Sequence, residues 1–341
     1  MRFIGSKRLL LKNIEYTIIQ NIKDFDNLSV FCDIFSGTSI VAQYFKKKYS
    51  IISNDLLYFS YVIQKTYIET NKVPQFNKVP DHIGDPIYYL NNLKDKHYRP
   101  GFVTNNFSPS GEDKRMYLSE INAARIDTIR GTLNKWKSDK FINKNEYFYL
   151  LCSLIESVPF VSNIAGTYGA YLKNWDKRSH KDLKLLDPSV YNNNKKNFAF
   201  NEDANSLIKK ISGDILYIDP PYNSRQYLPN YHLLETIAKY DNPKIKGKTG
   251  IREYQAEKSD YCSKKLVLDR FEDLINNADF KYIILSYNNE GLIPEDILDK
   301  VIKKFSYKIY KKYRYPYRRY KKDAKIIEHD LHELIYIIDK K

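Results

Sequence analysis

The sequence predicts an α/β protein built on a largely parallel sheet that is interrupted by a mostly helical insertion. Three observations predict this class. Short apolar runs alternate with helix-like stretches near both ends of the 341 residues, several of these runs end in an acidic residue, and the pattern between 61 and 195 changes to polar loops and amphipathic helices. We therefore expect a sheet domain formed by 1–60 and 196–341, with an inserted domain at 61–195.

The first sheet elements are expected between residues 30 and 55. The apolar run 30–35 contains Asp33 and precedes a turn of small residues and a helix-like stretch at 40–48. A second apolar run, 49–53, is followed by Asn54 and Asp55. The succession of strand, turn, helix and strand is typical of an α/β sheet.

The middle of the chain carries the helical signal. Apolar residues at Ile126, Ile129, Leu133 and Trp136 follow helical spacing within a segment that begins at Ser119. A second helix is expected at 144–157, and the asparagine-rich stretch 192–197 is typical of a linker.

Sheet-like runs return after the linker. Residues 198–203 and 215–218 are expected to be strands, and the continuous apolar character of 215–218 indicates a strand buried on both faces. Runs at 281–287 and 333–338 predict further strands.

The charge of the chain indicates a polyanionic partner but does not establish one. The net charge is +15, and lysine and arginine that neutralise phosphates supply affinity for nucleic acid. AT-rich coding also raises lysine, asparagine, isoleucine and tyrosine, and the chain has 31 tyrosines. Composition alone leaves these two interpretations open.

Other composition features indicate a cytoplasmic protein. No apolar run reaches the roughly 18 residues that span a bilayer, and residues 1–7 lack the apolar core of a signal peptide. The three cysteines are far apart, which is typical of reduced thiols and offers no zinc spacing. The acidic and histidine residues of 328–333 are interpreted as a chance grouping, so we expect no metal.

The segment Asp219-Pro220-Pro221-Tyr222 is the strongest chemical signal. It follows the buried run 215–218, and open α/β sheets bind ligands at the carboxyl ends of their strands. The prolines stiffen the turn, so a carboxylate, a carbonyl and an aromatic ring lie within one short segment. An exocyclic amine on a purine needs two acceptors and a surface to stack on. The alternative is a structural Pro-Pro turn in which Asp219 is a cap.

The turn after the first strand indicates a cofactor site. Small residues in 36–38 let the backbone approach a ligand, and Asp55 after the next strand is placed to bind a ribose diol. Asp55 could equally cap the helix that follows. No phosphate-binding Gly-Lys-Ser motif appears, which argues against nucleotide hydrolysis.

These motifs, in this order, resemble the D12 class of N6-adenine DNA methyltransferases, which includes Dam-type enzymes. The opening residues 2–7 resemble the family's N-terminal motif, with Phe3 in place of the usual tyrosine; residues 33–38 resemble its cofactor motif, and 219–222 match its catalytic motif. The resemblance implies a Rossmann-like methyltransferase sheet with an inserted target-recognition domain. It also implies methyl transfer from S-adenosylmethionine to an adenine flipped out of double-stranded DNA.

The resemblance implies roles for individual residues. The catalytic residues would be Asp219, Pro220 and Tyr222, and the cofactor-binding residues would be Lys7, Asp33, Phe35, Ser36, Gly37, Thr38, Asp55 and Asp203. Asp203 could instead cap the helix expected at 204–210. Ser39 stands where Dam-like motifs usually carry a second glycine.

The segments 219–227, 230–236, 105–109 and 115–117 are similar to a subgroup associated with type IIS restriction systems, which implies a cognate restriction endonuclease as a partner. Expected DNA contacts are Arg115, Arg225 and the basic, tyrosine-rich run 311–322, including Arg314, Arg318 and Arg319. That run could instead be a solvated connector. Methylation of RNA adenine or of a protein amide, and an inactive DNA-binding subunit, are the alternative functions.

Overall fold

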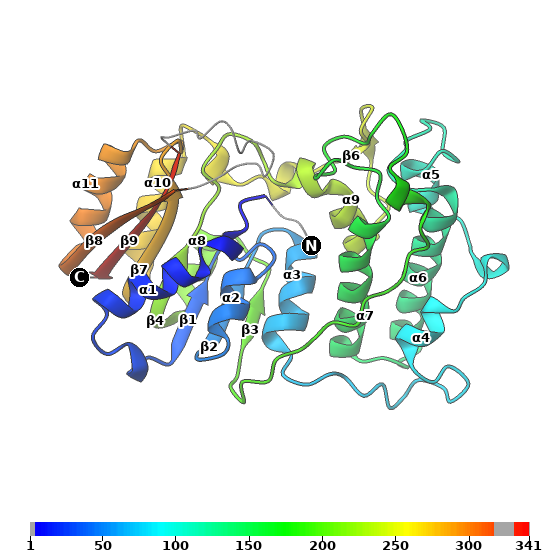
Figure 1. The fold of residues 1–341 in the computed structure, drawn as a ribbon, viewed down its shortest axis with the longest axis horizontal. Coiled ribbons are helices and arrows are strands. Elements are labelled where there is room, and N and C mark those ends of the chain that lie inside the picture. Colours follow the sequence, from blue (N-terminus) through cyan, green and yellow to red (C-terminus); the bar gives the residue numbers. More distant parts are fainter. Residues whose placement is uncertain (1–3, 317–330, 341) are drawn as a thin grey trace. The chain divides into compact units, whose positions relative to one another are not determined.

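A seven-stranded sheet carries the acidic residues singled out above, with strands in the order β3-β2-β1-β4-β7-β9-β8 (Figure 1). The computed structural model describes residues 4–316 and 331–340. The first five strands of this order are parallel, and β9 lies antiparallel to both β7 and β8. The strands are β1 (Val30–Asp33), β2 (Ser50–Asn54), β3 (Phe198–Phe200), β4 (Ser212–Ile218), β7 (Asp279–Asn288), β8 (Ser306–Pro316) and β9 (His332–Lys340).

The order of the strands reverses at β1. β2 and β3 lie on one side of it and β4 lies on the other, so the connections leave β1 and β4 in opposite directions. Such a switch point is where open α/β sheets bind their ligands, next to the carboxyl ends of the strands. The predicted α/β class, with a mostly parallel sheet, is confirmed.

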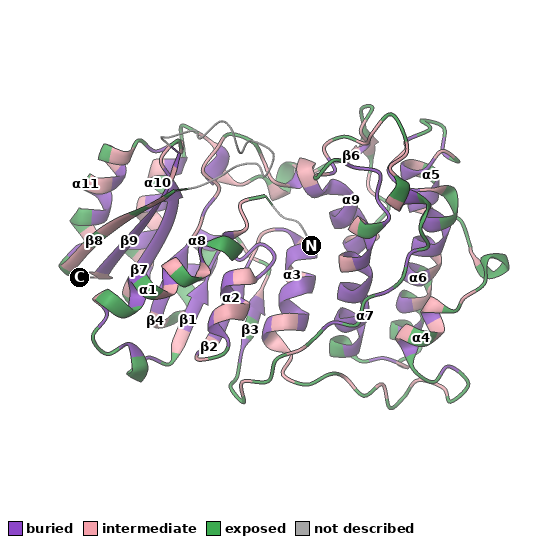
Figure 2. Ribbon diagram, viewed as in Figure 1, coloured by how far each residue is buried: buried purple, intermediate pink, exposed green. Residues whose placement is uncertain are grey.

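Helices cover both faces of the sheet. Successive residues of a strand point to opposite sides, so neighbouring residues of one strand pack into different cores. Phe31 of β1 stacks on Phe45 at 4.4 Å between ring centroids on the face covered by α1 (Leu11–Asn21) and α2 (Ile40–Phe45). Cys32 and Ile34 belong instead to a core with α10 (Val267–Asn277) and α11 (Glu295–Phe305). The central strands are therefore buried toward their carboxyl ends, and most of their ribbon is coloured as buried in Figure 2.

A second compact unit is mainly helical. We call it the helical unit; it comprises Leu57–Asn192 and Tyr227–Glu257 with Ile4, whereas the sheet unit comprises Gly5–Leu56, Asn193–Gln226 and the described part of 258–341. The elements of the helical unit are α3 (Tyr58–Gln64), α4 (Pro86–Asn91), α5 (Phe102–Phe107), α6 (Glu120–Ser138), α7 (Lys144–Ser157), α9 (Leu228–Lys239) and the short strands β5 (Ile245–Lys246) and β6 (Ile251–Arg252).

The residues that make up the helical unit differ from those of the insertion expected at 61–195. Residues 227–257 group with it although they follow the Asp219 turn in the sequence. The physical reason is the apolar face of α9, since Tyr231, Leu234 and Ile237 bury in one core with residues of α3, α6 and α7. The helical unit is thus formed mainly by two separate segments of the chain.

Local capping explains the two helices that were predicted best. Ser119 caps α6 by accepting a hydrogen bond from the Asn122 amide. Asn143 and Glu146 form a reciprocal capping box at the start of α7. Both helices therefore begin within a residue of the predicted start, because the signal that begins them lies in adjacent sequence.

The described part of the basic run, 311–316, lies in the long strand β8, which pairs with β9. Its residues alternate in direction. Tyr313 and Tyr315 turn to α1, where their hydroxyls bond Asn21 and Thr17 at 2.8 Å, whereas Lys312 and Arg314 form ion pairs with Glu295 of α11. The alternation of tyrosine with basic residues is the period-two pattern of a strand, so the described part of the run is one arm of an antiparallel pair with β9 and not a solvated connector.

Candidate active site

Three acidic residues follow neighbouring parallel strands at the same edge of the sheet. Asp33 ends β1, Asp55 comes directly after β2, and Asp219 comes directly after β4. β1 pairs with both of the other strands, so the three residues surround the switch point. The structure therefore brings together residues that are far apart in the sequence.

The turn after β1 is organised by two of these carboxylates. Asp33 Oδ2 accepts hydrogen bonds from Ser36 Oγ at 3.0 Å and the Ala42 amide at 3.2 Å. The amide of Gly37, whose φ is +52°, donates to Asp55 Oδ2 at 2.8 Å. The turn is thus fastened to the ends of both β1 and β2.

Asp33 has unused capacity to accept hydrogen bonds. Its Oδ1 is buried and has no partner among the described residues. Burial raises the pKa of this carboxyl to about 7, an effect that the hydrogen bond from Ser36 opposes. A buried oxygen without a donor is costly, and a cationic ligand donating to it would remove that cost.

Two other residues of the turn are held by packing. Phe35 packs edge-on against Tyr261, with 4.9 Å between centroids. Thr38 is largely buried, and its carbonyl accepts from Gln43. Ser39 has a left-handed backbone with φ of +62°, the region for which glycine is suited, and its buried hydroxyl has no partner among the described residues.

The buried side chain of Lys7 joins the turn at Asp219 to β9, which is the last strand in the sequence. Lys7 Nζ lies 2.8 Å from Asp219 Oδ1 and 3.1 Å from Glu333 Oε1, and Lys7 and Glu333 are almost fully buried. Glu333 also accepts from Ser286 Oγ at 2.5 Å. Glu333 was missed as a site residue because nothing near it in the sequence indicates that it meets Lys7.

The carboxyl of Asp219 is more basic than an ordinary aspartate. Burial raises its pKa to about 6; the charge of Lys7 lowers it, and the charge of Glu333 raises it. In the same turn, the ring of Tyr222 packs edge-on against Tyr287 at 6.5 Å, and its carbonyl accepts from the Leu292 amide at 2.9 Å. The turn therefore has a fixed backbone and a partly exposed carboxylate.

The chain matches the family model described as D12 class N6 adenine-specific DNA methyltransferase over residues 3–300. It belongs to this family. The match includes the ends of β1, β2 and β4, so the family predicted from the motifs is confirmed.

Individual methyltransferases support the same assignment. The chain is 52% identical to the Type II methyltransferase M.FokI of Planomicrobium okeanokoites and 46% identical to the modification methylase StsI of Streptococcus sanguinis, over its whole length in both cases. It spans 53% and 52% of those proteins, or about half of each. It is also 41% identical to the Type II methyltransferase M.NlaIII of Neisseria lactamica, over 95% of this chain and 93% of that protein.

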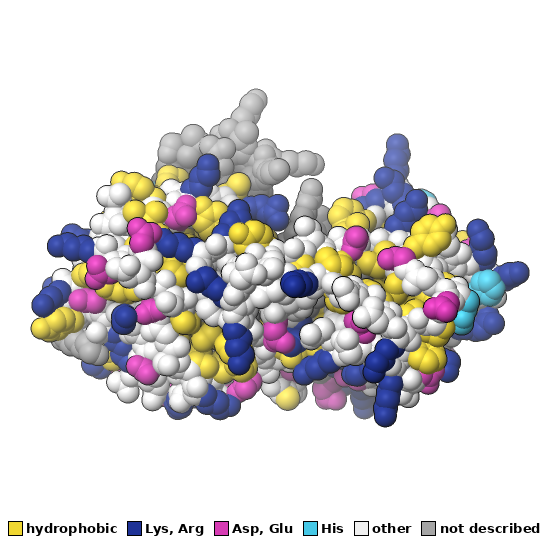
Figure 3. Space-filling view, turned by 90° about the horizontal axis from the view of Figure 1, so that it is seen from below, with side chains coloured by type: hydrophobic (Ala, Val, Ile, Leu, Met, Phe, Trp, Pro, Cys, Tyr) yellow, Lys and Arg dark blue, Asp and Glu magenta, His cyan; other side chains and the backbone are white. Residues whose placement is uncertain are grey.

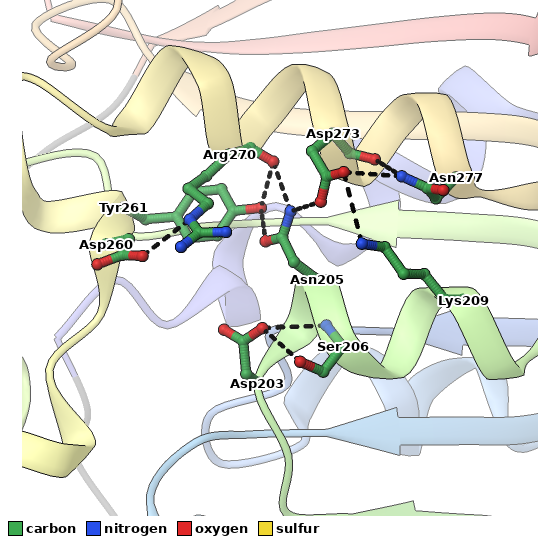
Figure 4. A network of polar contacts seen from close by, with 9 residues as sticks. All are labelled: Asp203, Asn205, Ser206, Lys209, Asp260, Tyr261, Arg270, Asp273 and Asn277. Carbon is green, nitrogen blue, oxygen red and sulfur yellow. Dashed lines mark hydrogen bonds and ion pairs between the residues drawn. The ribbon is translucent and has the colours of Figure 1, made fainter.

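Asp203 caps a helix in the sheet unit. Its Oδ1 accepts from the amide of Ser206 at 3.0 Å and from the Ser206 hydroxyl at 3.2 Å, at the start of α8 (Ala204–Leu207). Figure 4 shows both contacts beside a separate set of bonds that joins Asn205 to α10. The cap is the alternative that the sequence left open, and it engages the carboxylate that was expected near the cofactor.

Arg115 requires a correction. Its guanidinium is buried and donates to the carbonyls of Asn106, Gly247 and Lys248 at 3.0 Å each, and it pairs with Asp113. These bonds hold the turn between β5 and β6. The donors are directed at protein carbonyls, so the structure gives Arg115 a structural role in place of the predicted DNA contact.

The remaining arginines differ in their surroundings. Arg225 is exposed shortly after the Asp219 turn, and its amide donates to Asn223 Oδ1. Arg314 is also exposed but pairs with Glu295. Arg318 and Arg319 lie outside the described residues. Lysine and arginine side chains are spread over the face in Figure 3 with acidic ones among them, so charge does not mark one contact surface there.

Metal and membrane features are not found in the part of the chain that the structure describes. It contains no cluster of three or more histidine, cysteine or acidic side chains that could hold a metal, although 328–330 fall outside it. No helix in it is long and apolar enough to cross a membrane. His232 is a buried structural residue whose Nε2 lies 2.8 Å from the Tyr168 carbonyl, and burial lowers its pKa to about 4.

Proposed function

We propose that this chain transfers a methyl group from S-adenosylmethionine to the N6 amine of a flipped-out adenine in double-stranded DNA. The observation that carries the proposal is the position of Asp219-Pro220-Pro221-Tyr222 at the end of β4, beside the Asp33 and Asp55 turn. Family membership gives the type of reaction, and these residues give it a chemical basis.

The residues of the turn fit the proposed methyl donor. The unpartnered Oδ1 of Asp33 suits the amino group of an amino acid, and the small residues of 36–38 let backbone approach it. Asp55 is suited to ribose hydroxyls. Phe35 and Thr38 are proposed to shape the same site, and bound S-adenosylmethionine would supply an electrophilic methyl group there. Asp203 is not included, because its carboxylate caps α8.

The catalytic turn would prepare the amine for attack. The lone pair of N6 is delocalised into the purine ring, so the nitrogen is a weak nucleophile. Asp219 and the Pro220 carbonyl are proposed to accept its two hydrogens, which favours a more tetrahedral nitrogen. Stacking of the base on Tyr222 would contribute roughly 1–3 kcal/mol, offsetting part of the few kcal/mol that base extrusion costs. Lys7, which was predicted to bind the cofactor, is proposed instead to act through Asp219 by fixing its orientation, because its ammonium pairs with Asp219 and Glu333.

The cellular setting of the reaction is also part of the proposal. We propose a cytoplasmic restriction-modification methyltransferase with a cognate endonuclease as partner, in keeping with relatives that are named a Type II methyltransferase and a modification methylase. The helical unit is proposed to read the target sequence, together with phosphate contacts from Arg225, Arg314, Arg318 and Arg319.

The test compares Asp219→Asn with the wild-type protein in a labelled-methyl assay on DNA, RNA and protein. We expect transfer to DNA by the wild type, and a loss of at least about 100-fold in the variant with DNA affinity retained. Asp260→Asn, at a partly exposed acid that pairs with Arg270 elsewhere in the sheet unit, is the matched control. Transfer to RNA or protein would replace the substrate, and wild-type turnover in Asp219→Asn would refute the mechanism. Failure of the wild type to crosslink S-adenosylmethionine would favour an inactive DNA-binding subunit.

A further inference from the structure

Glu333 is a buried acid without an assigned role. It lies near the start of β9, its side chain is 1% exposed, and it falls beyond the residues 3–300 that the family model covers. Its backbone position pairs with Asn288 of β7, and its carboxylate accepts from Ser286 of the same strand. A carboxylate this deeply buried is costly unless a cation compensates it.

The compensating cation is Lys7, which Glu333 shares with Asp219. The two distances from Lys7 Nζ, 2.8 Å to Asp219 Oδ1 and 3.1 Å to Glu333 Oε1, place one ammonium between two carboxylates. Lys7 is 3% exposed, and its Nζ lies 6.0 Å from the centroid of the Tyr222 ring. Glu333 therefore holds the ammonium together with Asp219 of the catalytic turn.

This arrangement leaves one oxygen of Asp219 available. Lys7 engages Oδ1, whereas Oδ2 makes no hydrogen bond or ion pair with the described residues. An ammonium held by Asp219 alone could move to bridge both of its oxygens, because lysine is a flexible point charge. Anchoring by Glu333 restricts that movement.

We propose that Glu333 is a positioning residue for methyl transfer: it anchors Lys7 on Oδ1 of Asp219 and keeps Oδ2 free to accept a hydrogen of the target amine. The proposal rests on the proposed function. Glu333 also adds negative charge beside Asp219, which makes that carboxylate a stronger acceptor. The titratable groups near Asp219 in the described structure are Lys7, Asp33, Tyr217, Tyr222 and Glu333.

The test replaces Glu333 with glutamine and follows Asp219 without any ligand. Carboxyl-carbon NMR of protein labelled at aspartate, assigned with Asp219→Asn, reports the pKa of Asp219 directly. Removing the neighbouring negative charge favours the ionised form, so we expect the pKa of Asp219 to fall in Glu333→Gln. In methylation assays the acid limb of the kcat profile should move to lower pH, with kcat about tenfold lower and KM for DNA within twofold.

Two further variants keep the test decisive. Glu295→Gln removes the same charge from α11, where Glu295 pairs with Lys312 and Arg314, and should leave the titration of Asp219 unchanged. If Glu333→Gln does not fold, Glu333→Asp withdraws the carboxylate from Lys7 while keeping its charge, and kcat should still fall.

The outcomes separate this proposal from the proposed function. A wild-type protein that methylates no DNA refutes the proposed function, while the NMR titration still reports whether Glu333 acts on Asp219. Wild-type methylation combined with an unchanged Asp219 titration and unchanged kcat in Glu333→Gln overturns the role of Glu333 alone.

Discussion

The amide of Gly37 donates a 2.8 Å hydrogen bond to Oδ2 of Asp55, which fastens the turn after β1 to the end of β2. One carboxylate thus shapes the turn and is also the proposed partner of the ribose. We expect Asp55→Ala to weaken binding of S-adenosylmethionine by at least about tenfold, or ~1.4 kcal/mol, in calorimetric titration.

The matched control for this prediction is Asp203→Ala. Loss of the α8 cap should lower the free energy of unfolding by about 1 kcal/mol and leave affinity for the methyl donor within twofold. A larger loss of affinity in Asp203→Ala than in Asp55→Ala would return Asp203 to the cofactor site.

Ser39 is a position at which the natural residue destabilises the fold. Its left-handed backbone costs about 1–2 kcal/mol for a residue with a side chain, and its buried hydroxyl has no partner among the described residues. Glycine relieves both terms and loses about 0.4–1 kcal/mol through the flexibility of the unfolded chain. We expect Ser39→Gly to raise the free energy of unfolding by roughly 1 kcal/mol in urea titration. Gly37→Ala, at φ of +52°, should lower the free energy of unfolding. Equal stability of the two variants would show that backbone strain does not affect stability at these two positions.

The raised pKa of Asp33 predicts a pH-dependent stability. The native protein holds this proton up to a pKa of about 7, whereas the ordinary value is 3.8, so the native state binds more protons between these values. Stability contributed by this group therefore falls as the pH rises from about 4 to 7 and changes little above that.

Asp33→Asn isolates this effect because other groups cancel in the difference from the wild type. The asparagine oxygen can still accept from Ser36 and Ala42, and its amide replaces the unpartnered oxygen. We expect the variant to gain stability relative to the wild type across this window, by up to about 4 kcal/mol, while binding S-adenosylmethionine more weakly. Melting temperatures measured from pH 4 to 8 test this, and a difference that does not vary with pH would contradict it.

Removing the charge of Arg115 and of Arg225 should have different effects. The first change should lower the stability of the fold, and the second should reduce the salt dependence of DNA binding. Arg115→Met leaves three carbonyls of the β5–β6 turn and its surroundings without their donor, so we expect a loss of about 2–4 kcal/mol in the free energy of unfolding. Arg225→Gln should change stability by less than about 0.5 kcal/mol and reduce the slope of log affinity for DNA against log salt by about 0.9. A reduced salt slope in a folded Arg115 variant would restore its predicted DNA contact.

Local sequence determined the class of the fold and the residues of the proposed catalytic turn. Strand 215–218, the acidic residues that follow strands, and the limits of α6 and α7 could be predicted because periodicity and caps involve residues only a few positions apart. The ordered motifs extended this to the family. The alternation in β8 was also present in the sequence, but the density of basic residues favoured other interpretations.

Tertiary structure alone decided what the long charged side chains contact. Arg115 bonds a carbonyl 133 positions away, and Lys7 reaches Glu333 near the other end of the chain. Residues 227–257 likewise join the helical unit through the apolar face of α9. Lysine, arginine and glutamate have similar local patterns whether they are solvated or buried, since their partners are set by strand order and packing. The sequence thus identified Asp219, and the fold supplied the Lys7 and Glu333 pair that holds it.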